Sequence, residues 1–91
     1  MKYRISEAAE DDLFSIAEYG DIHYGEAQSD LYGQGLEQRF AQIAEQPYLY
    51  QSVDHIKPGY RRSNYRAHQI YYRMTDQGIE IMRIIGKQNF P

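Results

Sequence analysis

The segment that most limits the fold runs from His68 to Ile85, where two stretches rich in strand-forming residues flank a turn. HQIYYRMT and IEIMRII are rich in isoleucine, tyrosine and threonine, which favour strands, and DQG between them is typical of a tight turn. The pattern predicts a β-hairpin centred on residues 75–78. The stretch GYRRSNY precedes it and predicts one more strand, so the C-terminal part of the chain is expected to form an antiparallel sheet.

The N-terminal half has a different pattern. KYRIS alternates apolar and basic residues, which predicts a short strand, and Ser6 is a plausible N-cap. Apolar and small residues then recur at spacings of three and four, which predicts one helix over residues 7–22 and, after Gly25, a second helix that stops before Pro47. Gly33 and Gly35 lie inside the second helix, where we expect them to allow close packing against the first.

The segment between the second helix and the strands, residues 46–59, contains two prolines and a glycine without a sustained period, and predicts a loop. The order strand, helix, helix, loop and three strands predicts an α+β fold (β-α-α-β-β-β), with an N-terminal strand and a helical hairpin packed on a C-terminal antiparallel sheet. Ninety-one residues are enough for one core only, so residues 1–91 are expected to form a single domain.

The charge of the chain is unevenly distributed along the sequence. Residues 1–56 hold three basic and eleven acidic side chains, a net charge of −8, whereas residues 57–91 hold seven basic and two acidic ones, a net charge of +5. The overall charge of −3 argues against wholesale wrapping of nucleic acid, and we expect no direct nucleic-acid binding by the chain alone. The opposite signs predict a basic face for an acidic partner.

Composition also limits the compartment and the chemistry. The chain has no cysteine, MKYRIS lacks the apolar core of a signal peptide, and no apolar run reaches the roughly 20 residues that span a bilayer. These features favour a cytoplasmic protein without a membrane partner. His23, His55 and His68 are too far apart for a known metal motif, and no nucleotide-binding or nucleophile motif is present, so we expect no metal, no cofactor and no catalytic residue. Asp11 and Asp12 are interpreted as part of a solvated helix surface.

Basic and aromatic residues are interleaved in the C-terminal half, a composition that stacks on bases, pairs with phosphates or anchors a protein interface. On the last strand, alternation places Arg83 on one face with Ile79, Ile81 and Ile85. A partly covered guanidinium needs hydrogen-bond acceptors. Arg83 therefore either pairs with an internal carboxylate or main-chain carbonyls, or contacts a partner, and the sequence leaves both open.

The stretches YGEAQSDLY, IKPGYRR, HQIYYR and IEIMRII, in this order and at these separations, resemble the ParE branch of the RelE/ParE superfamily of bacterial toxins. The resemblance covers nearly the whole chain and implies a cytoplasmic toxin of a type II toxin–antitoxin system. It implies inhibition of DNA gyrase by direct binding. It also implies a cognate ParD-like antitoxin that docks a helical C-terminal segment and forms a hetero-oligomer with the toxin.

Two sets of residues are assigned on this basis. The basic and aromatic side chains predicted to contact the target are Tyr60, Arg61, Tyr72, Arg73, Arg83 and Lys87. The apolar side chains predicted to contact the antitoxin helix, or else to belong to the core, are Leu13, Ala17, Leu31, Leu36 and Phe40.

Two alternatives accompany this interpretation. A RelE-like, ribosome-dependent mRNA endonuclease would use His68, Arg61 and Arg83 as catalytic groups, although the acidic net charge weighs against it. The chain also departs from the family's usual C-terminus, because KQNFP follows Gly86 and contains no acidic residue. Since the tail is implicated in toxicity in this family, an inactive homologue that only binds the antitoxin as a corepressor is the third possibility.

Overall fold

The computed structural model describes residues 2–86, which form one strand, two helices and four further strands. The elements are β1 (Tyr3–Ile5), α1 (Glu7–Tyr24), α2 (Glu26–Glu45), β2 (Gln51–Ser52), β3 (Tyr60–Tyr65), β4 (His68–Thr75) and β5 (Gly78–Gly86). The predicted order of strand, helical hairpin and three C-terminal strands is confirmed. The two-residue β2 is an addition, because it forms within the segment predicted as a loop.

The strands form one mixed sheet in the order β1-β5-β4-β3-β2. β3, β4 and β5 pair antiparallel as predicted, and the turn between β4 and β5 falls at residues 76–77. β1 lies parallel to β5, with Tyr3 opposite Ile79 and Ile5 opposite Ile81. The helical hairpin therefore serves as the long crossover that a parallel pair of strands requires.

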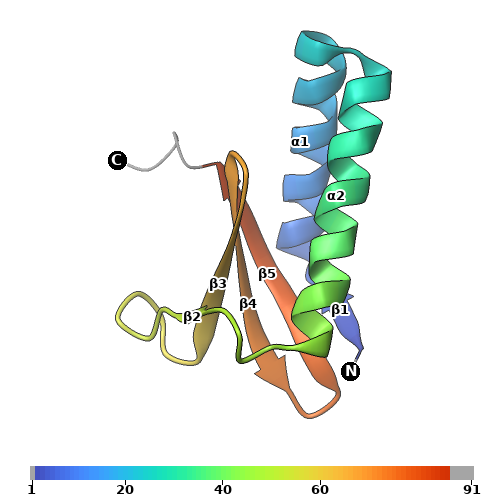
Figure 1. Cartoon of the computed structure of the whole chain (residues 1–91). Helices are drawn as coiled ribbons and strands as arrows, with labels where there is room; N and C mark the ends of the chain where they lie inside the picture. Colours follow the sequence, from blue (N-terminus) through green and yellow to red (C-terminus); the bar gives the residue numbers. More distant parts are fainter. Residues whose placement is uncertain (1, 87–91) are drawn as a thin grey trace.

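Both helices pack on one face of the sheet, and their connected ends extend past the ends of the strands (Figure 1). The opposite face has no helix on it and is called the open face below. The core between helices and sheet is made of side chains that are at most 3% exposed: Ala9, Leu36, Phe40, Ile43, Ala44, Ile70, Tyr72, Ile79, Ile81 and Ile84. Each large apolar side chain buried in this way contributes about 1.5–3 kcal/mol.

Local sequence sets the ends of the helices. The Ser6 side chain accepts a hydrogen bond from the Ala9 N–H at 3.1 Å, which confirms Ser6 as the N-cap of α1. Gly25 is the single residue between α1 and α2, and its φ of +87° lies in the region that favours glycine. One glycine thus reverses the chain between the two helices.

The glycines of α2 do not have the role predicted from the sequence. A Cβ at Gly35 would stand 1.8 Å from the Tyr65 hydroxyl oxygen, so Gly35 makes room for a side chain of β3 and not for α1. Gly33 has no heavy atom within 4 Å of such a Cβ. The close approach of the helices occurs at Gly20 of α1, where a Cβ would stand 2.8 Å from the Ser29 hydroxyl oxygen.

A β-bulge in β5 changes the predicted faces of this strand. Tyr71 pairs with Arg83 and Tyr72 with Ile81, so Met82 is an extra residue in the ladder. From Met82 onward, the bulge therefore reverses which face of the sheet each side chain of β5 points to. Ile81 and Ile84 both face the helices, whereas Arg83 pairs with Tyr71 on the open face. The prediction that Arg83 shares a face with Ile79 and Ile81 is therefore wrong.

Candidate functional site

Asp12 of α1 holds the guanidinium of Arg83. Arg83 Nε donates to Asp12 Oδ2 at 2.8 Å and Nη2 donates to Oδ1 at 3.0 Å, and Oδ2 also accepts from the Ile84 N–H at 2.8 Å. The hydrogen bond with Asp12 raises the pKa of Arg83, so the guanidinium stays charged. This geometry confirms pairing of Arg83 with a carboxylate, and it makes Asp12 a structural residue where the sequence suggested a solvated one.

Hydrogen bonds from Ser6 and Asp12, at the start of α1, cover the edge of β5 beyond the end of β1. The Ser6 hydroxyl donates to the Met82 carbonyl at 2.9 Å, and the Asp12 carboxylate accepts from Ile84, two residues further along. Because the N–H and C=O of one strand residue point to the same side, the Ile84 carbonyl and the backbone of Gly86 also face this edge. The start of α1 thus occupies two positions that a neighbouring strand would otherwise fill.

A cleft of about 730 Å³ lies between the distal parts of the two helices and the ends of β4 and β5. Its helical wall includes Ile16, Tyr19 and Tyr24, and its strand wall includes Ile84 and Ile85. The cleft is mostly apolar with a few polar groups, which is typical of sites that bind a ligand or a peptide.

Tyr32 and His68 meet in this cleft. The Tyr32 hydroxyl and His68 Nδ1 are 2.6 Å apart, and the two rings are in edge-to-face contact with centroids 5.5 Å apart. Burial lowers the pKa of His68, although Asp12 partly opposes this effect, and burial raises the pKa of Tyr32. His68 is therefore a neutral imidazole at neutral pH, fixed by its hydrogen bond.

Of the three groups considered for RNA cleavage, Arg61 is not brought together with the other two. Arg61 donates from Nη1 to the Tyr50 carbonyl at 2.7 Å and pairs in the sheet with Tyr72, whereas His68 pairs with Tyr65 at the other end of β3. Four residues along a strand correspond to about 13 Å. Arg83 and His68 both line the cleft, where the Arg83 guanidinium is bonded to Asp12 and the His68 ring to Tyr32.

The residues predicted to bind the target are distributed over both faces of the sheet. Arg73 lies on the open face, where its Nη2 forms an ion pair with Glu80 at 2.8 Å, and Tyr60 is partly exposed beside it in the ladder. Tyr72 is fully buried and donates its hydroxyl proton to the Pro47 carbonyl, so its prediction as a surface anchor is wrong. Lys87 lies outside the described residues.

The predicted antitoxin contacts also divide into core and surface. Leu36 and Phe40 are fully buried against the sheet and cannot form a docking surface, so for these two the alternative of a core role is correct. Leu13 is partly buried against the core, and Ala17 and Leu31 are exposed.

The sequence pattern missed the most exposed aromatic and aliphatic residues of α1. Phe14, Tyr19, Ile22 and Tyr24 are 69%, 55%, 74% and 67% exposed. Tyr19 and Tyr24 line the cleft, whereas Phe14 and Ile22 do not. The sequence did contain a signal for these exposed residues. They are large and apolar but lie outside the spacing of three and four that marks the buried face of the helix, so they do not pack in the core.

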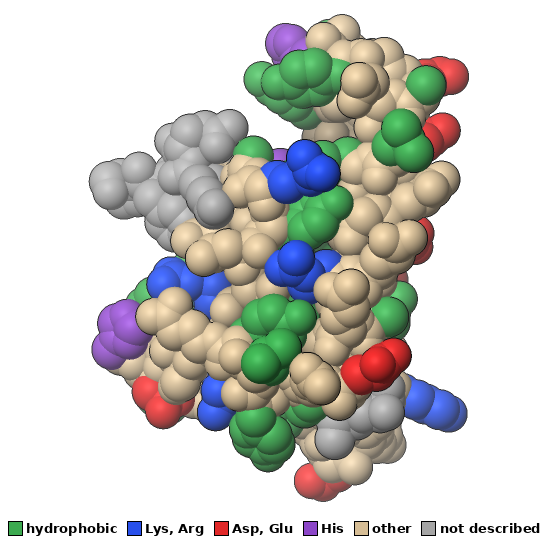
Figure 2. Space-filling model, viewed as in Figure 1, with side chains coloured by type: hydrophobic (Ala, Val, Ile, Leu, Met, Phe, Trp, Pro, Cys, Tyr) green, Lys and Arg blue, Asp and Glu red, His purple; other side chains and the backbone are tan. Residues whose placement is uncertain are grey.

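The surface reflects the division of charge in the sequence. In Figure 2 several acidic side chains follow the outer margin of the helices and others lie at the lower end of the molecule, whereas most basic side chains in this view lie over the sheet. Separated regions of opposite charge orient an approaching charged partner.

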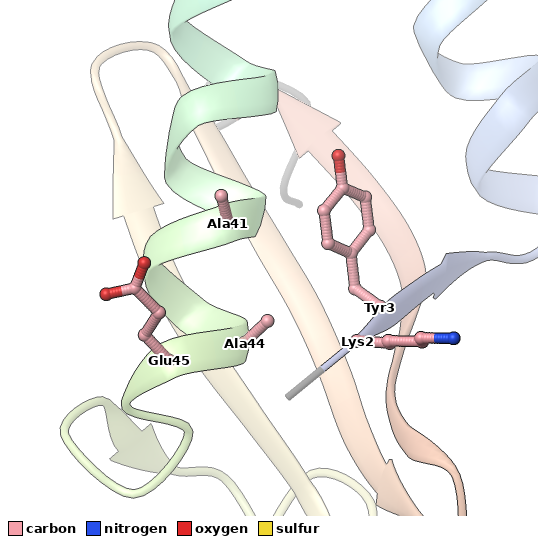
Figure 3. Close-up of a pocket in the computed structure, with 5 residues that line it drawn as sticks. All are labelled: Lys2, Tyr3, Ala41, Ala44 and Glu45. Atoms are coloured by element: carbon pink, nitrogen blue, oxygen red, sulfur yellow. The ribbon is translucent and has the colours of Figure 1, made fainter.

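A second, shallow depression of about 370 Å³ lies where the end of α2 meets β1 (Figure 3). It is lined by Lys2, Tyr3, Ala41, Ala44 and Glu45, and none of the predicted site residues lines it. Across residues 2–86, no group of three histidine or acidic side chains is placed to hold a metal ion, and no helix is both long and apolar enough to cross a bilayer.

The arrangement of helical hairpin and mixed sheet also occurs in a chain of a solved toxin–antitoxin system. A chain of the solved "Chromosomal ParDE TA system from P. aeruginosa" superimposes with a TM-score of 0.83, covering 94% of this chain and 95% of that one. Sequence identity is 17%, so this likeness concerns the fold alone.

Sequence comparison identifies the family. The family described as "ParE toxin of type II toxin-antitoxin system, parDE" matches residues 3–89, and the chain belongs to it. Toxin ParE1 of Caulobacter vibrioides is 32% identical over 83 residues, covering 91% of this chain and 85% of the relative. Toxin ParE1 of Mycobacterium tuberculosis is 29% identical over 88 residues, covering 96% and 90%. The resemblance to ParE toxins is thereby confirmed.

Proposed function

We propose that this ParE-family toxin acts by stoichiometric binding of DNA gyrase through the open face of its sheet, without turnover. The observation that carries the proposal is family membership across residues 3–89. The open face supports it, because Arg73 is held by Glu80 next to the partly exposed Tyr60. Arginine and tyrosine side chains in fixed positions are frequent anchors of protein interfaces.

The placement of the titratable groups favours binding over RNA cleavage. A general base needs to reach the substrate hydroxyl and a cation needs to reach the phosphate at the same time. His68 is bonded to Tyr32 and Arg83 to Asp12, both in the lining of the cleft, whereas Arg61 lies near the other end of β3. Arg61 would therefore not act together with His68 and Arg83 on one phosphodiester.

Titration of purified gyrase with the toxin tests this proposal. Supercoiling is expected to fall until about one toxin is present per gyrase binding site, and Arg73→Gln is expected to raise the toxin concentration needed. Arg66→Gln removes the same charge from the helix side of the sheet and is expected to have no effect. Normal supercoiling at a large excess of toxin would exclude gyrase, and codon-specific cuts in translated mRNA would favour the endonuclease.

The tail gives a specific reason to test toxicity itself. KQNFP after Gly86 contains no acidic residue, which is the departure that supports an inactive, antitoxin-binding homologue. Expression in bacteria without the antitoxin is expected to stop growth. Normal growth at a verified protein level would support the corepressor role instead.

We further propose that a ParD-like antitoxin neutralises the toxin by placing an amphipathic helix in the cleft and an extended segment along the free edge of β5. The cleft offers exposed Tyr19 and Tyr24 to an apolar helix face, and the edge offers the Ile84 carbonyl and the Gly86 backbone to a strand. The extended segment would then lie beside Arg83, at the margin of the open face.

Two aromatic residues of α1 make a matched pair for testing the antitoxin site. Tyr19 lines the cleft and Phe14 does not, yet both are more than half exposed and tolerate a polar replacement. Tyr19→Arg is expected to abolish co-purification with the product of the adjacent antitoxin gene, and Phe14→Arg is expected to preserve it. Equal retention by both variants would place the antitoxin elsewhere.

A further inference from the structure

Four strands of the sheet place a row of polar side chains across the open face. Gln51 of β2, Arg62 of β3, Tyr71 of β4 and Arg83 of β5 are directly opposite one another in the ladders. Arg73 lies on the same face two residues from Tyr71. Three arginines thus start from this row or beside it, although the Arg83 guanidinium turns to Asp12 at the edge of β5, and their charges are compensated to different degrees.

Arg62 differs from the other two because it has no carboxylate partner within residues 2–86. Arg73 is paired with Glu80 and Arg83 with Asp12, whereas Arg62 Nη1 donates to the Tyr71 hydroxyl at 3.3 Å and Nη2 donates to Gln51 Oε1 at 3.4 Å. Both bonds are long and both acceptors are neutral. The guanidinium carbon lies 5.8 Å from the centre of the Tyr71 ring.

The surroundings of Arg62 are costly for folding. The side chain is partly buried, and its Nε is buried without a hydrogen-bond acceptor. A buried donor left unsatisfied costs about 1–3 kcal/mol, and more when the group is charged. Folding alone gives no reason for a cation at this position, because a neutral side chain would avoid that cost. An external anion would offset this cost by accepting stronger hydrogen bonds from Nη1 and Nη2, whose present bonds are long.

We infer that Arg62 is the anchor of a carboxylate-binding site, which takes an aspartate or glutamate side chain of the target protein. This inference rests on the proposed capture of a protein target. A carboxylate accepts two parallel hydrogen bonds from a guanidinium, and these are roughly twice as strong as the neutral bonds to Tyr71 and Gln51 that they would replace. Arg73 and Arg83, already neutralised, would shape the surroundings of the site without competing for the anion.

The distribution of charge favours a protein carboxylate over a nucleic-acid backbone. Binding to a phosphate backbone depends on several cations acting together. On this face the described residues supply one uncompensated arginine, and the chain as a whole carries a charge of −3. A single acidic side chain in a protein interface matches one free guanidinium, whereas a polyanion would be repelled by the acidic helices.

Two variants that remove one positive charge each test the site against gyrase holoenzyme. Arg62→Gln is expected to weaken toxin binding by about tenfold or more, with Arg62→Lys between it and the wild type. Arg66→Gln is expected to bind like the wild type. If the wild type binds gyrase and Arg62→Gln binds equally well, the carboxylate site is excluded while the proposed target stands.

A measurement without gyrase tests the carboxylate site at Arg62 independently of the proposal that gyrase is the target. The NMR signal of the Arg62 Nε–H is expected to shift on titration with a hexaglutamate peptide and to shift less with a single-stranded oligothymidine at equal charge. No shift with the peptide, or a larger shift with the oligonucleotide, would overturn the inference. Thermal unfolding is the fold control, because Arg62→Gln removes an unsatisfied donor and should not lower the unfolding temperature. A large decrease would mean that Arg62 is structural.

Discussion

Asp12 is the residue through which α1 fixes the end of β5. Its carboxylate accepts three hydrogen bonds, two from Arg83 and one from the Ile84 N–H, although it is 71 residues from Arg83 in the chain. Asp12→Ala is expected to lower the free energy of unfolding by about 1–3 kcal/mol, because the Ile84 N–H loses its acceptor. Urea denaturation monitored by circular dichroism measures this change.

Asp11 is the matched control for Asp12. It is adjacent in α1 and exposed, and it makes no ion pair with another described residue. Asp11→Ala is expected to change the free energy of unfolding by less than about 0.5 kcal/mol. Equal effects at the two positions would mean that Asp12 stabilises the fold through its negative charge near the N-terminus of α1 and not through its hydrogen bonds to β5.

His68 predicts a pH dependence of stability near neutrality. Burial lowers its pKa in the folded state below the ordinary value of about 6.5 that applies when the chain is unfolded. The unfolded chain therefore binds the proton more readily, so stability is complete above that pH and decreases as the pH falls below it. Urea denaturation between about pH 5.5 and 7.5 should show this decrease.

Replacement of His68 tests whether this residue causes the dependence of stability on pH. His68→Asn is expected to flatten the dependence in this window. An unchanged slope in His68→Asn would show that the imidazole does not titrate differently in the two states.

At the level of elements, α2 contains two glycines with opposite expected effects. Gly33→Ala is expected to raise the free energy of unfolding by about 1 kcal/mol, because alanine favours the helix and its Cβ meets nothing within 4 Å. Gly35→Ala is expected to lower it by about 1–3 kcal/mol, because the Cβ would displace the Tyr65 ring. Denaturant midpoints measure both changes, and stabilisation by Gly35→Ala would mean that Tyr65 can move freely.

Elements set by neighbouring residues were predictable from the sequence. The β4–β5 hairpin, the Ser6 cap and the break at Gly25 each depend on a few consecutive residues. The bulge at Met82, the contact of Gly35 with Tyr65 and the pair of Asp12 with Arg83 depend on distant parts of the chain. A strict period of two was the only available rule for β5, so one inserted residue moved Arg83 to the other face.

The residue types of the candidate site were predictable from the sequence, but the burial and pairing of each residue were not. Basic and aromatic composition placed the proposed target surface on the sheet, yet it assigned Tyr72 to that surface and did not distinguish Arg62 from the paired arginines. Burial and pairing decide both points, and each requires the arrangement of strands. The cleft likewise depends on how far the hairpin extends past the sheet, a property of packing that no local pattern contains.

At the scale of the whole molecule, the proposed partners use different sides of one sheet. The cleft lies between the helices and the sheet, whereas Arg62 and Arg73 face the opposite side. An antitoxin helix in the cleft would therefore leave the open face accessible. Only a segment that continues along the edge of β5, past Arg83, would reach that face.

This geometry predicts that binding and neutralisation by the antitoxin can be separated. An antitoxin fragment that ends with its cleft-binding helix is expected to co-purify with the toxin without restoring gyrase supercoiling, whereas a fragment that includes the following extended segment should restore it. Pull-down and supercoiling assays on the same complexes measure both properties. Full restoration by the helix alone would mean that the target also needs the cleft, and the division of the toxin into two working faces would then be wrong.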